Sequence, residues 1–337
     1  PGQNREKVEM RAAWFDSFGA AKDVLNVGEK KTPVAESGEV LVRLATSGVN
    51  PSDVKKRAGS FPNLLEDGFV IPNSDGAGII EAVGDGVDAS RVGERVWIYQ
   101  AQYGRRFGTA AEYLAIDARR ASKLPDAASF EVGACLGIPA MTAHRCVFAD
   151  GDVAGQTVLV TGGAGRVGHY AVQWASQAGA TVIATASNDA DRETCLSAGA
   201  HHVVNHRSDD IVAEIMAVTD DELVDRIVDV EFGGNLPTSV EVLRIGGTIA
   251  TYSSTQVTEP KLPFLTMMYK DLTVRLVIVY AMPEEAKELA IADIEKALSA
   301  DSLQHRVAQT LPLDDIAKSN ELIEQGSIRG AVVLTIG

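Results

Sequence analysis

The sequence predicts an α/β protein in which a β-rich unit is joined to a doubly wound parallel sheet. Two observations lead to this fold class. Up to about residue 125, short runs rich in Val, Ile and aromatic residues alternate with glycine, which is typical of short antiparallel strands. Beyond that point, strand-length apolar runs alternate with amphipathic helical stretches, which indicates parallel strands joined by helices. At 337 residues the chain is long enough for two such domains.

The individual elements follow from local composition. In the first part, runs of β-branched or aromatic residues end in glycine or polar turns, and we expect strands at residues 40–47, 78–83, 95–100 and 109–116. In the second part, an apolar run at 157–161 precedes a glycine-rich turn at 162–168 and a helix over 167–178. Further strands are expected at 181–185, 201–204, 225–230 and 247–252. This alternation predicts a parallel doubly wound sheet.

The C-terminal part begins near Ala281 with a strong helical pattern at residues 283–299. It ends in an apolar, strand-like run at 330–336. Pattern alone leaves two interpretations of that run open: a strand that returns to the β-rich unit, or a third layer on the parallel sheet. In the first case the β-rich domain is built from both ends of the chain.

The composition is that of an acidic globular protein. Charged residues make up 23% and apolar ones 45%, which disfavours a disordered chain. With 31 Lys and Arg against 46 Asp and Glu, the formal net charge is −15, and such a surface repels nucleic acid and anionic membranes. No apolar run approaches the roughly 18 residues that span a bilayer. Residues 1–9 lack a signal-peptide core, and Cys135, Cys146 and Cys195 form no C-x-x-C motif, so we expect a cytoplasmic protein without disulfides.

The strongest local signal is the segment VLVTGGAGRVG at residues 158–168. Gly163, Gly165 and Gly168 satisfy G-x-G-x-x-G directly after an apolar strand and at the start of a helix. Glycines there let the backbone turn sharply and bring main-chain N–H groups up to a pyrophosphate, while the positive end of the helix dipole faces the same anion. We therefore expect a dinucleotide here, and the alternative is a purely structural turn.

The end of the second parallel strand distinguishes the two nicotinamide dinucleotides. An NAD site places Asp or Glu there, about 20 residues on, to accept from the ribose 2′-hydroxyl. Here the strand ends in Ala186-Ser187 with no carboxylate before Asp189. Ser187, Arg192 and Arg207 supply hydroxyl and guanidinium donors that suit a 2′-phosphate. We therefore expect NADPH, and the alternative for either arginine is a solvated surface charge.

Five further motifs stand along the chain. They are SGVNPSD at 47–53, IPNSDGAGIIEAVG at 71–84, VGERV at 92–96, GIPAMTAHR at 137–145 and GAHHVVNHR at 199–207. Together with the glycine loop, they resemble the medium-chain dehydrogenase/reductase superfamily, and most closely its zinc-independent quinone oxidoreductases related to zeta-crystallin. The resemblance extends from about Met10 to Ile336. It implies a GroES-like catalytic domain, residues 1–127 and 278–337, a Rossmann NADPH-binding domain, residues 128–277, and a cofactor in the cleft between them.

The resemblance also implies roles for individual residues. Asn50 is implied as the catalytic group that faces the nicotinamide and donates to the substrate oxygen, although Asn before Pro is also a common turn former. With the glycine loop and the phosphate donors, the expected cofactor ligands are Asn50, Thr142, Gly162, Gly163, Gly165, Arg166, Val167, Gly168, Ser187, Arg192, His206, Arg207, Tyr252, Ser253, Val277, Ile278 and Val279. The expected substrate contacts are Lys55, Phe61, Tyr103 and Arg106. The last two are expected from the residues themselves, because the loop at 99–107 is aromatic and basic in an otherwise acidic chain.

Some of these positions have structural alternatives or depart from the family pattern. Thr142 is equally compatible with a helix interior, residues 277–279 with a buried strand, and Lys55 with an exposed helix lysine. Lys55 and Phe61 stand where some relatives carry tyrosines. Arg166 replaces a glycine that is common in the phosphate loop of the family, and it either contacts the pyrophosphate or points to solvent.

The same resemblance provides a test for metal. Zinc-dependent relatives carry Cys where Ser47 stands and a His-Glu pair in the segment aligned with Ser74-Asp75. Catalytic zinc needs about three ligands from Cys, His and Asp or Glu, and a serine hydroxyl is a poor ligand. No cysteine lies between residues 85 and 130, where the structural zinc lobe of those relatives has its ligands. We expect no metal.

Without a Lewis acid, the favoured substrate is one that accepts hydride readily because a conjugated carbonyl spreads the charge. We therefore predict an NADPH-dependent quinone oxidoreductase that acts on a quinone or an α,β-unsaturated carbonyl. The alternatives are a crystallin-like NADPH-binding protein with a structural or regulatory role and little catalysis, and a zinc-free alcohol or sugar dehydrogenase. The resemblance implies a homodimer or homotetramer that extends the Rossmann sheet through the apolar run at 272–279.

Overall fold

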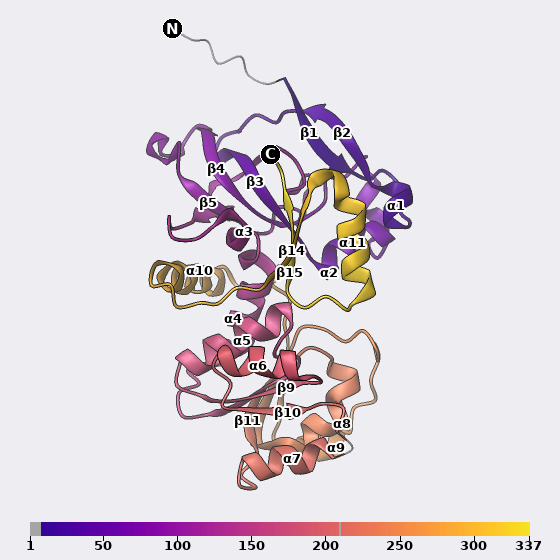
Figure 1. Cartoon of the computed structure of the whole chain (residues 1–337), viewed down its shortest axis with the longest axis vertical. Helices are drawn as coiled ribbons and strands as arrows, with labels where there is room; N and C mark the ends of the chain where they lie inside the picture. The colour runs from indigo at the N-terminus through magenta and orange to yellow at the C-terminus, as the bar shows by residue number, and fades with distance from the viewer. Residues whose placement is uncertain (1–7, 209) are drawn as a thin grey trace. The chain divides into compact units, whose positions relative to one another are not determined.

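The structure is a computed structural model of the chain, and it describes residues 8–208 and 210–337. It contains two compact units. One consists of the chain up to Ile138 together with Ile291–Gly337, and the other of Pro139–Ala290 (Figure 1). The first unit is thus built from both ends of the chain. Most of the segment on which the signal-peptide expectation rests, residues 1–7, lies outside the described residues.

The first unit is organised around a seven-stranded sheet. Its strands are β3 (Glu39–Val49), β4 (Asp75–Val83), β5 (Arg95–Ile98), β6 (Tyr113–Asp117), β7 (Ala121–Lys123), β14 (Val307–Pro312) and β15 (Ala331–Thr335). The order is β14-β15-β3-β4-β5-β7, and β6 pairs with β3. All these pairs are antiparallel except β14 with β15. The C-terminal strand β15 lies against β3, with Val332 opposite Val49.

Short elements surround this sheet. The antiparallel strands β1 (Glu9–Trp14) and β2 (Asn26–Lys31) form a separate two-stranded sheet. The α-helices are α1 (Ala21–Val24), α2 (Pro51–Ala58), α3 (Phe130–Gly133) and α11 (Ile316–Gln325). The sequence explains the limits of α2, because Pro51 presets the dihedral angle of the first helical residue and Gly59 ends the helix in the left-handed conformation, at φ 103°.

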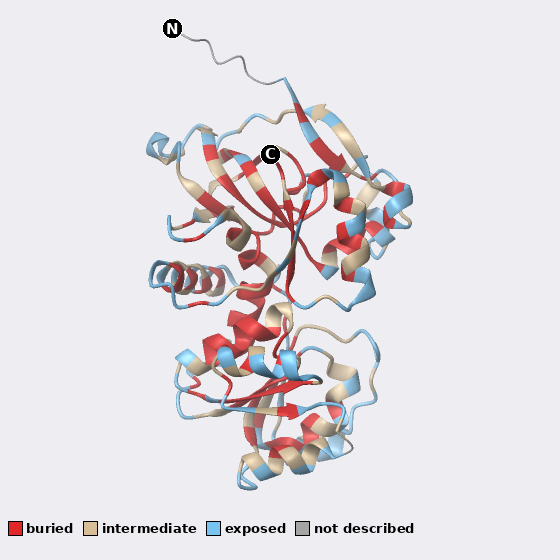
Figure 2. Cartoon of the chain, viewed as in Figure 1, coloured by how far each residue is buried: buried red, intermediate tan, exposed pale blue. Residues whose placement is uncertain are grey.

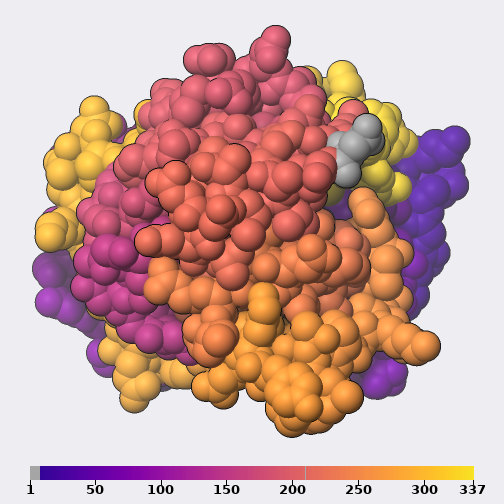
Figure 3. Space-filling model, turned by 90° about the horizontal axis from the view of Figure 1, so that it is seen from below, coloured from indigo at the N-terminus to yellow at the C-terminus, as the bar shows by residue number. Residues whose placement is uncertain are grey.

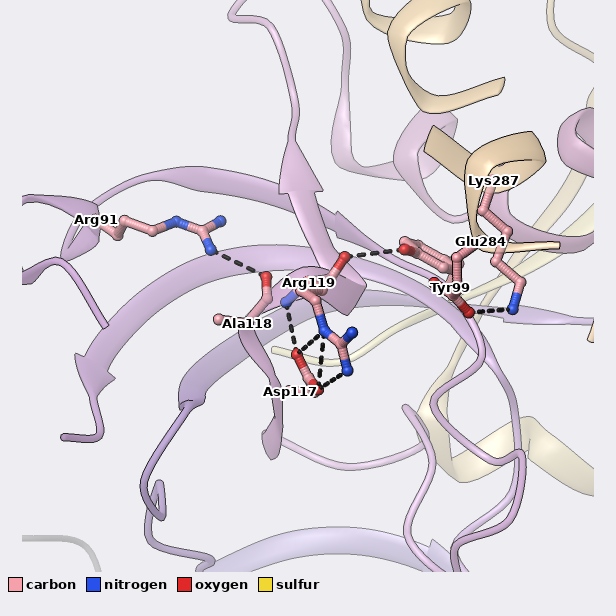
Figure 4. Close-up of polar contacts among 7 residues, drawn as sticks. All are labelled: Arg91, Tyr99, Asp117, Ala118, Arg119, Glu284 and Lys287. Atoms are coloured by element: carbon pink, nitrogen blue, oxygen red, sulfur yellow. Dashed lines mark hydrogen bonds and ion pairs between the residues drawn. The ribbon is translucent and has the colours of Figure 1, made fainter. Parts of the chain in front are cut away.

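Alternating apolar residues of β3 build the core of the first unit. Val40 and Val42 are buried, and residues of β6 and β15 such as Leu114 and Val332 pack in the same cluster (Figure 2). Near the sheet edge, polar contacts tie the turn after β6, Ala118–Arg120, to its surroundings. Figure 4 shows Arg91 donating to the carbonyl of Ala118 and Tyr99 donating to the carbonyl of Arg119.

The second unit contains a six-stranded sheet in which every pair is parallel. Its strands are β8 (Thr157–Val160), β9 (Thr181–Ala186), β10 (His202–Asn205), β11 (Val224–Asp229), β12 (Leu243–Thr251) and β13 (Thr273–Leu276). The order is β10-β9-β8-β11-β12-β13, so the direction of winding reverses between β8 and β11. In such a sheet, ligands bind outside the carboxyl ends of the strands at this reversal.

Helices connect these parallel strands in chain order: α5 (Arg166–Gln177), α6 (Asp189–Ser197), α7 (Ile211–Val218), α8 (Phe232–Val242) and α9 (Phe264–Tyr269). Helix α4 (Met141–Phe148) precedes β8, and α10 (Glu284–Ser299) follows β13. On α10, Lys287 donates to Glu284 at 2.7 Å (Figure 4). Strands β8, β9 and β11 carry near-continuous runs of buried residues, as expected for a sheet covered on both faces (Figure 2). Within the described ranges, no helix combines the length and apolar character needed to cross a membrane.

The predicted fold class is confirmed, while several element assignments need correction. The run at 109–116 is a strand only from Tyr113, and the buried Thr109 instead donates through Oγ1 to the carbonyl of Asp75 at 2.6 Å. The run at 95–100 ends as a strand at Ile98. The β-rich part also contains α2, which the glycine spacing does not indicate. The predicted domain limits at 127/128 and 277/278 stay predictions, and residues 128–138 group with the first unit by contact.

Candidate functional site

The glycine-rich loop connects β8 to α5. Gly162 has a φ of 62°, in the left-handed region that favours glycine. Its N–H donates to Oγ1 of Thr185 at 2.9 Å, and the N–H of Gly163 donates to the Thr185 carbonyl at 3.1 Å, which ties the loop to the end of β9. Helix α5 then begins at Arg166, with Gly165 as its N-cap. Because the first turn of a helix has N–H groups without intrahelical acceptors, this helix start suits an anion.

Close packing explains why two loop positions are glycine. A Cβ on Gly163 would lie 2.8 Å from the Cβ of Ala184, and a Cβ on Gly168 would lie 2.2 Å from the carbonyl oxygen of Gly162. At Gly165 the nearest such contact is 3.2 Å, also to the Gly162 carbonyl. Glycine therefore provides a sharp turn at 162, close packing of the loop on β9 at 163 and close packing of α5 on the loop at 168, as a dinucleotide-binding loop requires.

Ser187, Arg192 and Arg207 are the residues predicted to meet a 2′-phosphate, and the predicted cofactor ligand His206 lies beside Arg207. Ser187 follows β9 directly and is half-buried. Arg192 is exposed in α6, where its Nη1 donates to the carbonyl of Val203 at 2.9 Å. His206 and Arg207 follow β10 and are exposed. Three of these four residues thus follow the carboxyl ends of two neighbouring strands, and Arg192 lies in the helix that connects those strands.

One buried carboxylate joins the carboxyl ends of β8, β11 and β12. Oδ1 of Asp229 accepts from Oγ1 of Thr161 at 2.9 Å and from Nδ2 of Asn235 at 2.8 Å. Its backbone carbonyl accepts from Oγ1 of Thr251 at 3.1 Å. Burial raises the pKa of Asp229. Thr161 in turn accepts from the N–H of Val230 at 2.9 Å, so this network holds the start of the glycine loop against the neighbouring strand.

The residues predicted on the nicotinamide side follow β12 and β13 or lie in α4. Tyr252 and Ser253 come directly after β12 and are half-buried. Residues 277–279 lie beyond the end of β13, so they are not strand residues, and Ile278 between its two buried neighbours is 58% exposed. Thr142 is buried within α4. Their contacts with a cofactor stay predictions.

In the first unit, Asn50 belongs to a buried polar cluster at the start of α2. Its side chain is embedded in the protein, with the residue 3% exposed, and its Nδ2 donates to Oδ2 of Asp75 at 2.8 Å. Its N–H donates to Oδ2 of Asp53 at 2.8 Å. The N–H of Ile138 donates to Oδ1 and Oδ2 of Asp75 at 3.1 and 3.0 Å. Asn50 therefore caps a helix and is also oriented by a carboxyl group distant in sequence.

Burial controls the ionisation of this cluster. Desolvation raises the pKa of Asp75 from 3.8 to about 8, although the hydrogen bond from Ile138 opposes the change. Desolvation also raises the pKa of Asp53 to about 6, against the charge of Lys56. Burial lowers the pKa of Lys56, whose Nζ donates to the carbonyl of Gln102 at 2.7 Å. Groups with perturbed pKa values of this kind gather at functional sites.

Ser47 is engaged in hydrogen bonds next to this cluster. Its Oγ lies 2.7 Å from Oγ1 of Thr109 and accepts from Nδ2 of Asn73 at 2.9 Å. Asn73 is buried with a φ of 77°, a strained conformation for a residue other than glycine. Across residues 8–208 and 210–337, no group of three or more His, Cys, Asp and Glu side chains is placed to hold a metal ion.

The predicted substrate contacts lie at or near the surface of the first unit. Lys55, Phe61 and Tyr103 are exposed. Arg106 donates through Nε to the carbonyl of Phe69 at 3.0 Å, and its guanidinium lies 5.1 Å from the centre of the same residue's ring. Arg106 is thus packed on an aromatic ring of its own unit. A role in substrate binding stays a prediction for all four residues.

Sequence reasoning misses the carboxylates that organise both polar networks. Asp75 is named there only as a position aligned with zinc ligands, Asp53 only as part of a family motif, and Asp229 is not named. A usable signal exists for two of them. Asp75 is the single charged residue between Ile71 and Ile80. Asp229 ends a predicted parallel strand, directly after Ile227 and Val228, at the edge where ligands bind.

Comparisons with known proteins agree on one family. The model of the alcohol dehydrogenase GroES-like domain matches residues 36–126, and that of the zinc-binding dehydrogenase matches residues 167–296. Human quinone oxidoreductase is 30% identical over 321 residues, which cover 94% of this chain and 95% of the human protein.

Two solved structures extend the likeness over nearly the whole fold. A mycobacterial quinone oxidoreductase has a TM-score of 0.85 at 26% identity, with 97% of this chain and 99% of that chain covered. A mycobacterial protein solved in complex with NADPH has a TM-score of 0.84 at 25% identity, with the same coverage of 97% and 99%. By these matches and by its parallel sheet with a glycine loop, the chain belongs to the quinone oxidoreductase family of medium-chain dehydrogenase/reductase enzymes.

Proposed function

We propose that the chain binds NADPH at the carboxyl edge of its parallel sheet and reduces a quinone or an α,β-unsaturated carbonyl without zinc. The observation that carries this proposal is the glycine loop. Gly162 needs a positive φ, and neither Gly163 nor Gly168 has room for a Cβ. A relative named quinone oxidoreductase and a structural neighbour complexed with NADPH support it.

The end of β9 supports NADPH over NADH. Ser187 follows the strand where an NAD site places a carboxylate. We assign Ser187, Arg192, His206 and Arg207 to the 2′-phosphate. The hydrogen bond from Arg192 to the carbonyl of Val203 orients its guanidinium, which reduces the entropy lost when a phosphate binds.

Bound NADPH supplies the hydride, and the side chains of the protein position it and stabilise charge. In our proposal the start of α5 holds the pyrophosphate, and Tyr252, Ser253 and residues 277–279 hold the nicotinamide end. Asn50 donates a hydrogen bond to the acceptor oxygen on which negative charge develops. Its orientation depends on Asp75, which accepts from Nδ2 of Asn50 at 2.8 Å.

We propose that the reaction needs no zinc, even though one matching family model is described as a zinc-binding dehydrogenase. Ser47 is a hydroxyl and not a thiolate, and it is hydrogen-bonded to Thr109 and Asn73. A hydroxyl is a poor zinc ligand at neutral pH. Quinones and conjugated carbonyls accept hydride without a Lewis acid, because conjugation spreads the charge.

We also propose that copies of the chain pair through β13 to form a homodimer or homotetramer. In the part of the chain that the structure describes, β13 pairs with β12 alone. Leu276 and Tyr269 nearby are 75% and 76% exposed, and Figure 3 shows this orange part of the chain on the surface. An edge strand with an exposed apolar side chain such as Leu276 can pair with another sheet. A cytoplasmic location stays a prediction from composition.

The test is an absorbance assay of NADPH oxidation by the purified chain with a panel of quinones and enals. The proposal expects oxidation that depends on the acceptor and persists with a chelator. Tight NADPH binding without turnover would support the structural or regulatory alternative. Reduction of NADP⁺ by alcohols would support a zinc-free dehydrogenase instead.

A further inference from the structure

A loop that follows β12 is held by one carboxylate. Oε2 of Glu231 accepts from the N–H of Thr255 at 2.8 Å and from its Oγ1 at 3.1 Å. Both carboxylate oxygens accept from the N–H of Gln256 at 3.1 Å, and Oε1 accepts from the N–H of Val257 at 3.3 Å. Three consecutive N–H groups therefore converge on one anion, an arrangement that stabilises negative charge.

The helix that follows Glu231 fits the same loop closely. Glu231 is the N-cap of α8, and the N–H of Gly233 donates to Oγ of Ser254 at 2.9 Å. A Cβ on Gly233 would lie 2.2 Å from the carbonyl oxygen of Val257. Partial burial raises the pKa of Glu231, but the hydrogen bonds from the loop outweigh it and hold the pKa below its usual value. The loop 254–257 is thus fixed to α8 by an ionised side chain and by close packing.

The place of this loop in the sheet relates it to one half of a dinucleotide. Each half of a doubly wound sheet takes one mononucleotide, and the halves meet between β8 and β11. Ser187 and Arg192 lie on the β9 side, which we assign to the adenosine 2′-phosphate. Glu231 follows β11 and the loop follows β12, so both lie on the other side. The N–H of Phe232 also donates to the carbonyl of Ser253 at 2.9 Å.

We propose that Glu231 is a positioning residue for the nicotinamide half of the coenzyme. By holding residues 254–257 it fixes the preceding Tyr252 and Ser253 in the conformation that meets the nicotinamide ribose. Glu231 acts through the loop and does not itself touch the coenzyme. This inference rests on the proposed function, because it assumes that NADPH binds at this edge of the sheet.

The test compares two ligands on the variant Glu231→Gln. The neutral amide has one acceptor oxygen in place of two charged ones, so the loop loses its anchor. We expect NADPH affinity to fall about tenfold, whereas the affinity for adenosine 2′,5′-bisphosphate, which lacks the nicotinamide half, stays within about twofold. Glu231→Asp keeps the charge on a shorter side chain and is expected to give an intermediate NADPH affinity. Glu241→Gln is the matched control, because Glu241 is exposed at the far end of the same helix.

Calorimetric titration of the full chain separates the outcomes. Equal losses for NADPH and the bisphosphate would mean that Glu231 supports the fold in general, and no loss for either would mean that the loop needs no anchor. Either result overturns the inference about Glu231, but neither contradicts the proposal that the wild-type chain binds NADPH. A wild-type chain that binds neither ligand would instead overturn the proposed function. Melting curves of the variants confirm that they are folded.

Discussion

The buried carboxyl group of Asp75 makes the stability of the chain depend on pH. Burial raises its pKa from 3.8 to about 8, so near neutrality the folded chain keeps a proton that the unfolded chain has lost. The stabilising contribution of a raised carboxyl pKa is greatest at acidic pH and declines as pH rises from the unfolded towards the folded pKa. The decline is about 1.4 kcal/mol per pH unit for one group, or about 3 kcal/mol between about pH 5 and about pH 7. Asp53, with a pKa of about 6, contributes in the same direction over the acidic part of this range.

The variant Asp75→Asn removes this titration while keeping the size of the side chain. We expect the free energy of unfolding of the wild type, measured relative to the variant, to fall by about 3 kcal/mol from about pH 5 to about pH 7. Urea unfolding of both proteins at several pH values measures this difference. Asp67→Asn serves as a control, because Asp67 is exposed, and its unfolding is expected to follow the wild type at every pH. A difference between wild type and Asp75→Asn that is constant with pH would refute the account of a neutral, buried Asp75.

Three further predictions concern the second unit. Asp150→Asn removes the carboxylate that pairs with the buried Arg226 at 2.9 Å. Urea unfolding should show that the free energy of unfolding falls by about 2 kcal/mol, less than for a fully buried pair because Asp150 is partly exposed. A decrease below about 0.5 kcal/mol would contradict this prediction. Leu276→Lys places a charge on the β13 edge, so gel filtration should show a smaller species than the wild type, and an unchanged elution volume would exclude pairing through this edge. Arg192→Ala should weaken NADPH binding at least about tenfold with little effect on NADH binding, because it removes a contact with the 2′-phosphate. Equal losses of affinity for NADPH and NADH would mean that Arg192 does not meet the 2′-phosphate.

The parts of the fold that could be predicted are those encoded by neighbouring residues. The strand at β8, the glycine loop and helix α5 follow one another along the chain, so apolar periodicity and glycine spacing suffice to identify them. The end of β13 at Leu276 and the late start of β6 could not be predicted, because tertiary contacts decide where an apolar or β-branched run enters and leaves a ladder.

In the candidate site too, only the features encoded by neighbouring residues could be predicted. The glycine loop is local, and the sequence alone locates it. The hydrogen bonds of Asp75 to Asn50 and Ile138 join three segments that are distant in the chain, so no local pattern reveals them. The same holds for Glu231 and the loop 254–257, which meet because β11 and β12 are neighbours in the sheet.

Hydride transfer from NADPH without a metal is the central claim, and isotope transfer tests it most directly. NADPH deuterated at the transferred position of nicotinamide C4 would be incubated with the metal-analysed, chelator-treated chain and an α,β-unsaturated carbonyl. The account predicts that deuterium appears on the β-carbon of the reduced product at an unchanged rate after chelation. Product without deuterium, or activity that disappears on chelation and returns with zinc, would contradict it.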